Sequence, residues 1–85
     1  MDRLIVDVRE PQEYYSGHVE GSVNIPVSKL LGDVKELEGI DKGTKIVLYC
    51  RTGSRSGVAI EILGAKGYTN LINGINKDQV ISNYL

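Results

Sequence analysis

The sequence contains no phenylalanine and no tryptophan, and it has one cysteine, one histidine and two prolines among its 85 residues. A single cysteine forms no internal disulfide, and with one histidine it lacks the ligand set and the spacing of a zinc site. Acidic side chains (11) and basic side chains (10) nearly cancel, which argues against nucleic acid or an anionic membrane as a partner. No apolar run approaches the roughly 18 residues of a spanning helix.

The length predicts one small domain with one core over residues 1–85, and we expect it to be a monomer. No basic and apolar leader is visible. A strand is nevertheless expected as early as Leu4, as in a mature protein whose signal peptide has been removed. The compartment is therefore left open between the periplasm, after such removal, and the cytoplasm.

Apolar, β-branched runs alternate with segments of helical periodicity along the chain. Strands are predicted at residues 4–8, 22–25, 45–49 and 69–72. Helices are predicted at residues 11–17, 28–39, 56–66 and 76–85. A turn is predicted at Asn73-Gly74. This alternation is typical of an α/β fold with a mostly parallel sheet, in which the very apolar strand at 45–49 is central and helices cover both faces.

The only cysteine, Cys50, lies where the most apolar strand ends and a helix is about to begin. Backbone N–H groups and the positive end of the helix dipole converge there, which favours a thiol pKa lowered from about 8.5 toward 7. Many free cysteines only pack in a core. A packing cysteine, however, needs neither Gly53 for tight backbone curvature nor a polar loop followed by a helix. We therefore interpret Cys50 as a nucleophilic thiolate.

The loop after Cys50 is short, polar and cationic, as an oxyanion-binding loop requires. Arg55 lies nearest the helix N-terminus and is favoured as the oxyanion ligand, whereas Arg51 is expected to face solvent and to tune substrate choice. The residues expected to supply mainly backbone N–H groups around the sulfur are Thr52, Gly53 and Ser54. Ser56 is expected mainly to cap the helix, with contact between its hydroxyl and the substrate as the alternative.

Polar residues outside the loop are expected to support it. We predict that Asp7 and Arg9 form a buried ion pair or hydrogen bonds that brace the loop, rather than acting directly in catalysis. The single histidine, His18, lies in a predicted turn, where a bracing role is favoured over that of a general base. The carboxylates expected to be solvated or to cap helices are Glu10, Glu13 and Glu20.

Two blocks of sequence, residues 5–26 and 46–56, with a continuing match through 67–71, resemble a single-domain rhodanese (thiosulfate sulfurtransferase) of the short, phage-shock-protein-E type. The resemblance implies a rhodanese-like three-layer α/β fold, with helices on both faces of a short, mostly parallel sheet of four to five strands. It implies that Cys50 carries a persulfide in a six-residue loop ending at Arg55. The framework positions that it implies are Asp7, Arg9, His18, Gly21, Asn24 and Pro26. One departure is that a glycine pair common before the last helix appears here as Asn73-Gly74.

The implied activity is transfer of the sulfane sulfur of thiosulfate to cyanide or a thiol through the Cys50 persulfide, with no metal and no organic cofactor. Two alternatives stay open. One is a non-catalytic binding or persulfide-relay module of the same fold. The other is a cysteine-dependent phosphatase or arsenate reductase, but the phosphate-binding loop of such enzymes has the pattern Cys-x5-Arg. Cys50 and Arg55 form Cys-x4-Arg, and the smaller ring suits one sulfur atom better than a phosphoryl group.

Overall fold

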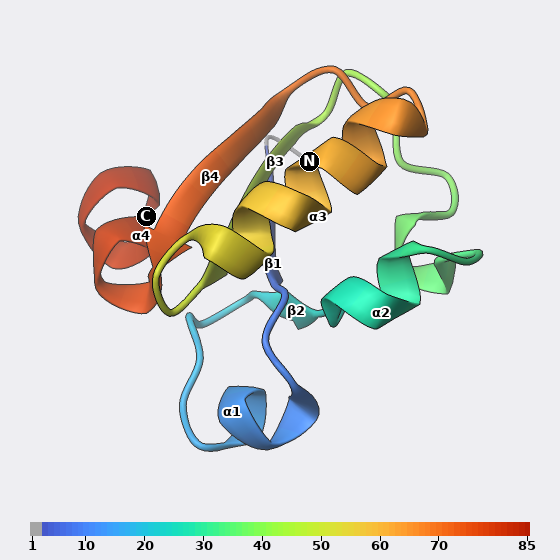
Figure 1. The fold of residues 1–85 in the computed structure, drawn as a ribbon. Helices are drawn as coiled ribbons and strands as arrows, with labels where there is room; N and C mark the ends of the chain where they lie inside the picture. The colour runs from blue at the N-terminus through green and yellow to red at the C-terminus, as the bar shows by residue number, and fades with distance from the viewer. Residues whose placement is uncertain (1–2) are drawn as a thin grey trace.

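A single parallel sheet organises the computed structural model, which describes residues 3–85 (Figure 1). The strands in that range are β1 (Arg3–Asp7), β2 (Val23–Asn24), β3 (Lys45–Cys50) and β4 (Leu71–Asn76). They lie in the order β2-β1-β3-β4, and every pairing is parallel. The position of β3 between β1 and β4 confirms the prediction that the most apolar strand is central.

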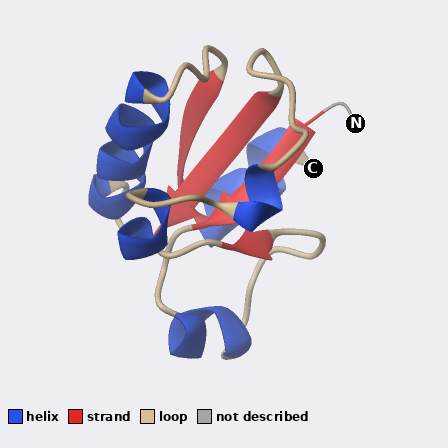
Figure 2. Ribbon diagram, turned by 90° about the vertical axis from the view of Figure 1, so that its right-hand side faces the viewer, coloured by secondary structure: helices blue, strands red, loops and turns tan. Residues whose placement is uncertain are grey.

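Helices cover both faces of this sheet, so the predicted three-layer α/β architecture is confirmed (Figure 2). They are α1 (Pro11–Tyr15), α2 (Val27–Leu30), α3 (Ser54–Ala65) and α4 (Lys77–Tyr84), with a short 3-10 helix η1 (Lys35–Leu37). One apolar core lies between the sheet and α2, η1 and α3. A second, smaller core lies between the sheet and α4.

Side chains of β3 alternate between these two cores, as the period of two in a strand requires. Leu48 and Cys50 point toward the core that contains α3. Val47 and Tyr49 point toward the core that contains α4. All four side chains are buried, because a parallel strand with helices on both faces meets no solvent. Cys50 and Tyr49 are therefore adjacent in sequence but lie on opposite sides of the sheet.

The prediction of one helix over residues 28–39 is wrong. α2 contains only Val27–Leu30, begins after Pro26 rather than at Ser28, and is followed by a turn and by η1. Gly32 falls where the helix would have continued, and a glycine costs about 1 kcal/mol of helix propensity relative to alanine. Four apolar residues suggested one helix: Leu30, Leu31, Val34 and Leu37. Three of them are buried in the core, but Leu31 is 71% exposed. The spacing of the other three therefore reflected burial and not one continuous helix.

The predicted turn at Asn73-Gly74 is also wrong, because β4 continues through it. Leu48 pairs with Asn73 and Tyr49 pairs with Ile75, which leaves Gly74 as an extra residue in a β-bulge. A Cβ atom on Gly74 would lie 2.6 Å from Val80 Cγ2, so only glycine allows α4 to pack this closely. The bulge places Asn73 beside the loop that follows Cys50.

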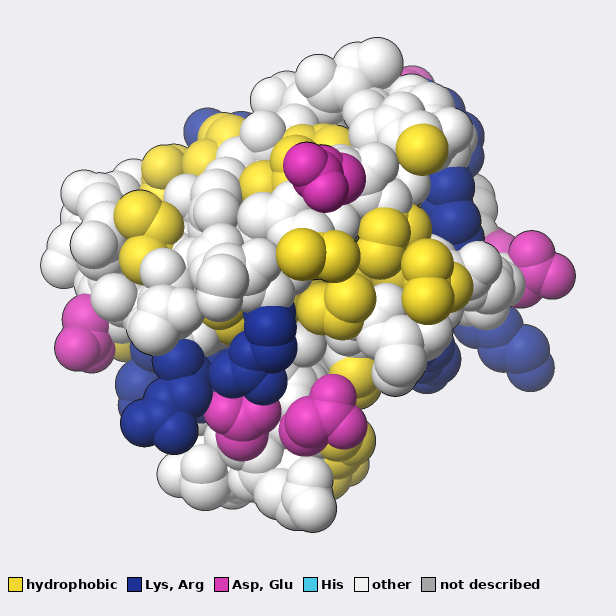
Figure 3. Space-filling model, in the orientation of Figure 1, with side chains coloured by type: hydrophobic (Ala, Val, Ile, Leu, Met, Phe, Trp, Pro, Cys, Tyr) yellow, Lys and Arg dark blue, Asp and Glu magenta, His cyan; other side chains and the backbone are white. Residues whose placement is uncertain are grey.

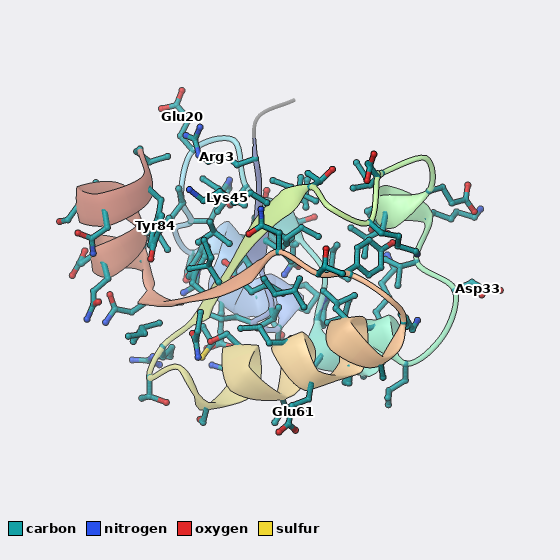
Figure 4. The ribbon with its side chains drawn as sticks, turned by 90° about the horizontal axis from the view of Figure 1, so that it is seen from above. Arg3, Glu20, Asp33, Lys45, Glu61 and Tyr84 are labelled. Atoms are coloured by element: carbon teal, nitrogen blue, oxygen red, sulfur yellow. The ribbon has the colours of Figure 1, made fainter. Side chains whose placement is uncertain are left out.

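On the face shown in Figure 3, Lys and Arg side chains gather at the lower left, and acidic side chains lie beside them. At the end of β3 opposite Cys50, Lys45 Nζ lies 5.9 Å from the centre of the Tyr84 ring (Figure 4). Glu61 points from α3 away from the sheet (Figure 4). Among residues 3–85, no helix has the length and hydropathy needed to cross a membrane.

Candidate active site

A tight loop connects the end of β3 to the start of α3 and surrounds the Cys50 sulfur. Cys50 is the last residue of β3, and Gly53 is the N-cap residue of α3. Gly53 has φ = 93°, a left-handed conformation that glycine adopts without steric cost. This conformation turns the Gly53 N–H back toward the sulfur, to which it donates a hydrogen bond of 3.1 Å.

The surroundings of the sulfur favour its ionised form. Burial raises the pKa of the Cys50 thiol, but the Ser56 hydroxyl and the backbone N–H groups of Ser56, Thr52 and Gly53 outweigh burial and lower that pKa to about 7. Near neutral pH about half of the thiol is therefore thiolate. The loop thus combines a buried sulfur with donors for negative charge, as a nucleophile requires.

Ser56 does not cap α3, contrary to the prediction. The helix begins two residues earlier, at Ser54, and its N-cap residue is Gly53. The Ser56 hydroxyl lies inside the first turn, 3.5 Å from Cys50 Sγ and 2.6 Å from Asn73 Oδ1. The side chain is fully buried, so it joins the sulfur to the β4 bulge.

Arg55 is anchored to α1 by a bidentate ion pair. Its two terminal nitrogens lie 2.6 Å and 3.0 Å from the Glu13 carboxylate oxygens. Glu13 also accepts the backbone N–H of Glu10, which closes a capping box at the start of α1. Hydrogen bonds from Arg55 and from that N–H lower the pKa of Glu13 to about 2. The expectation that Glu13 is solvated or capping was therefore incomplete, and oxyanion binding by Arg55 stays a prediction.

The remaining loop side chains point outward. Arg51, Thr52 and Ser54 are exposed, and the Thr52 and Ser54 hydroxyls lie 3.1 Å apart. Exposure of Arg51 agrees with the expectation that it faces solvent. A role for Arg51 in substrate choice stays a prediction.

Behind the loop, a buried polar network connects β1 to β3. The predicted ion pair is present: Arg9 Nη2 lies 2.7 Å from Asp7 Oδ2, and Asp7 is fully buried. The Tyr49 hydroxyl donates to Asp7 Oδ2 (2.9 Å) and accepts the N–H of Val19 (3.0 Å). Arg9 also donates to the Gly17 carbonyl at 2.7 Å. Sequence analysis missed the role of Tyr49 because its place in the most apolar strand predicted only burial.

His18 lies away from the sulfur, in the segment between α1 and β2. Its ring stacks on the Tyr14 ring with centres 3.7 Å apart, and its Nδ1 lies 2.8 Å from the Tyr14 carbonyl oxygen. These contacts hold His18 against α1, and its role in bracing the turn stays a prediction.

A cavity of about 330 Å³ opens beside Cys50 at the carboxyl ends of the strands. Its lining residues are Arg9, Cys50, Arg51, Asn76, Lys77 and Asp78. Crevices at this edge of a parallel sheet are the usual ligand sites of α/β folds. Lys77 was missed by sequence analysis, but its position directly after the last strand could have indicated it.

The fold and the site together define a class of protein: a parallel α/β domain with an activated cysteine on its strand-to-helix loop. Residues 1–78 match the rhodanese-like domain family, and the chain belongs to that family. The resemblance noted in the sequence is thereby confirmed.

Curated relatives and solved structures agree with this assignment. Thiosulfate sulfurtransferase PspE of Escherichia coli is 42% identical over 71 residues, which cover 80% of this chain and 64% of that protein. Thiosulfate:glutathione sulfurtransferase of Saccharomyces cerevisiae is 35% identical over 77 residues, 79% of this chain and 55% of that protein. The chain thus spans less than two thirds of the length of either relative.

Among solved structures, a rhodanese with anions from E. coli superposes with a TM-score of 0.79 and 33% identity, over 91% of this chain and 89% of that chain. The human single-domain sulfurtransferase TSTD1 superposes with a TM-score of 0.76 over 99% of this chain and 85% of that chain. At 24% identity, the human structure bears on the fold alone.

Proposed function

We propose that this domain is a sulfurtransferase that takes the sulfane sulfur of thiosulfate onto Cys50 and delivers it to cyanide or to a thiol. The observation that carries the proposal is the Cys50 sulfur itself, which is held by the Gly53 N–H at 3.1 Å and has a pKa of about 7. The names of the two relatives, thiosulfate sulfurtransferase and thiosulfate:glutathione sulfurtransferase, support the same reaction class.

In the first step, the Cys50 thiolate attacks the outer sulfur of thiosulfate. A new S–S bond forms between Cys50 Sγ and that sulfur, and the bond between the two thiosulfate sulfurs breaks. Sulfite leaves with the electron pair of the broken bond. The product is a Cys50 persulfide anion, so total charge is conserved and no external oxidant or reductant is needed.

In the second step, a nucleophile attacks the outer sulfur of the persulfide. Cyanide gives thiocyanate, and a thiolate gives a new persulfide on the acceptor. The bond between the two sulfurs of the Cys50 persulfide breaks, and Sγ keeps its electron pair as the thiolate. Cys50 is thus restored for the next cycle.

The residues around the cavity suit anionic donors. The N–H groups at the start of α3 and the helix dipole favour negative charge on the sulfur and on the departing sulfite. Arg51 and Lys77 line the cavity beside Cys50 and supply positive charge at its rim. Asp78 lies on the same rim and would repel a donor that approaches from its side.

A cysteine-dependent phosphatase is the less favoured candidate. Four residues separate Cys50 from Arg55, and the Arg55 terminal nitrogens are engaged by Glu13. A phosphatase of this kind would need Arg55 to grip the phosphoryl oxygens, so it would first have to break that ion pair.

The test is a thiosulfate:cyanide assay on the wild type and on Cys50→Ser, with thiocyanate as the readout. We expect turnover by the wild type and none by Cys50→Ser. Mass spectrometry after thiosulfate treatment should show one added sulfur that dithiothreitol removes and that Cys50→Ser lacks. Absence of thiocyanate from the wild type, or activity of Cys50→Ser, would refute the proposal. Hydrolysis of an aryl phosphate without sulfur transfer would favour the phosphatase.

A further inference from the structure

The Asn73 side chain is locked in one orientation by two backbone groups. Its Nδ2 donates to the Gly53 carbonyl at 3.0 Å, and its Oδ1 accepts the N–H of Ile75 at 3.0 Å. Rotating the amide by 180° would place Oδ1 against the Gly53 carbonyl, which is also an acceptor. It would place Nδ2 against the Ile75 N–H, which is also a donor. Oδ1 therefore faces α3 as an acceptor, on geometry alone.

This orientation decides where the Ser56 proton lies. Ser56 Oγ is 2.6 Å from Asn73 Oδ1, and because Oδ1 can only accept, the hydroxyl must donate. A hydroxyl has one proton, and the shorter contact to Asn73 is favoured over the Gly53 carbonyl oxygen, which lies 3.2 Å away. The hydroxyl lone pairs then face the remaining neighbours. One of these neighbours is Cys50 Sγ at 3.5 Å. While Cys50 is a thiol, its S–H can donate to Ser56, and every group is satisfied.

The arrangement changes when the sulfur becomes a thiolate. A hydroxyl lone pair next to a negative sulfur is unfavourable, and the hydroxyl can relieve this by turning its proton from Asn73 to Sγ. That rotation transfers no proton between residues, but it breaks the Ser56–Asn73 bond. In the persulfide the charge lies on the outer sulfur, so the Ser56 proton can return to Asn73.

We propose that Asn73 is a positioning residue for Cys50, which competes with the sulfur for the Ser56 proton and so sets how much the hydroxyl stabilises the thiolate. The inference rests on the proposed function for its place in a catalytic cycle. The predicted effect of Asn73 on the pKa of the Cys50 thiol does not depend on that function.

Other charged groups also act on the sulfur, and they are unchanged by substitution of Asn73. Those that line the cavity or lie on the loop are Arg9, Arg51, Arg55, Lys77 and Asp78. Arg55 is paired with Glu13. Because none of these side chains hydrogen-bonds Asn73, they form a constant background in a comparison of Asn73 variants.

The test is the pH dependence of Cys50 alkylation by iodoacetamide in four proteins: wild type, Asn73→Ala, Ser56→Ala and the double variant. Asn73→Ala removes the shorter of the two competing hydrogen bonds and leaves only the Gly53 carbonyl at 3.2 Å as a competing acceptor. We therefore expect a lower thiol pKa and an about threefold larger thiolate-to-thiol ratio near pH 6. In the Ser56→Ala background, Asn73→Ala should leave that ratio unchanged. In the protein that keeps Ser56, an unchanged or raised Cys50 pKa on Asn73→Ala would overturn the inference. An equal shift in both backgrounds would also overturn it, because Asn73 would then act only by holding the loop.

Asn73→Asp provides a second comparison if Asn73→Ala does not fold, as judged by circular dichroism. The aspartate keeps the acceptor for Ser56 and adds negative charge, so the thiolate-to-thiol ratio should fall, by about threefold or more. A larger ratio would overturn the inference. Alkylation needs no sulfur transfer, so the expected ratios without any persulfide would refute the proposed function and leave the role of Asn73 intact.

Discussion

Replacing Tyr49 with phenylalanine removes a single hydroxyl from the buried network behind the Cys50 loop. The ring is fully buried, and its hydroxyl is the only atom lost. In the wild type this hydroxyl donates to Asp7 Oδ2 at 2.9 Å and accepts the Val19 N–H at 3.0 Å. The substitution therefore leaves a buried backbone donor without its partner and deprives a buried carboxylate of one donor.

Both losses reduce the free energy of unfolding. A hydrogen bond to a charged group contributes about 1.5–3 kcal/mol, and an unsatisfied buried donor costs about 1–3 kcal/mol. Asp7 keeps its hydrogen bonds from Arg9, which limits the first loss. We expect Tyr49→Phe to destabilise the domain by about 3 kcal/mol, a large share of the roughly 5–15 kcal/mol typical of a native domain. At this chain length, such a loss lowers the Tm by roughly 12–24 °C.

The measurement is urea unfolding followed by circular dichroism, with thermal unfolding as a second readout. Tyr68→Phe is the matched control, because Tyr68 is also a buried tyrosine but lies in the other core, with Lys42 Nζ 4.0 Å from its ring centre. The control should lose less than about 1 kcal/mol. If Tyr49→Phe loses no more than the control, the network does not hold β1 against β3 in the way its geometry indicates.

Four further predictions concern the loop, the bulge and α3. In the proposed reaction the thiolate attacks, and the pKa of Cys50 is about 7, so persulfide formation should rise about tenfold from pH 6 to pH 8 and then level off. In a stopped-flow single-turnover assay, a rate that keeps rising beyond pH 9 would contradict this. Arg55→Ala should lower kcat/KM for thiosulfate more than Arg51→Ala, because it releases the loop from α1, and equal or reversed effects would refute the ranking. Gly74→Ala should destabilise the domain by about 2 kcal/mol or more, since its Cβ would lie 2.6 Å from Val80. Gly64→Ala, whose Cβ meets nothing within 4 Å in α3, should stabilise it by about 0.5–1 kcal/mol in denaturant unfolding.

Local sequence predicted the elements whose signals are themselves local. Alternating apolar strands and periodic helices indicated the parallel sheet, and the most apolar run became its central strand. The position of Cys50 between a strand and a helix indicated a polarised thiol, because N–H groups at a helix start are free by the geometry of any helix. Asp7 and Arg9 are two residues apart, so their pairing could also be predicted from the sequence.

Errors arose where tertiary packing decided between local alternatives. Residues Leu30, Val34 and Leu37 have helical spacing, but the chain buries them through a short helix and a 3-10 turn. Asn73-Gly74 has the composition of a turn, but these residues continue β4 as a bulged strand, and Gly74 leaves room there for Val80 of α4. At Gly32 the local propensity already disfavoured a helix by about 1 kcal/mol. At Gly74 close packing against Val80 accompanies the bulged strand.

The sequence by itself placed the single cysteine at the end of the central strand of a rhodanese-like domain, before a glycine-containing loop, and predicted that it is a nucleophile. Only the tertiary structure decided which groups control that loop. Glu13 and Arg55 are 42 positions apart, as are Asp7 and Tyr49, and Ser56 and Asn73 are 17 apart. Such pairs depend on how strands register and where a bulge falls, and a shift of one residue turns every side chain to the opposite face of the sheet.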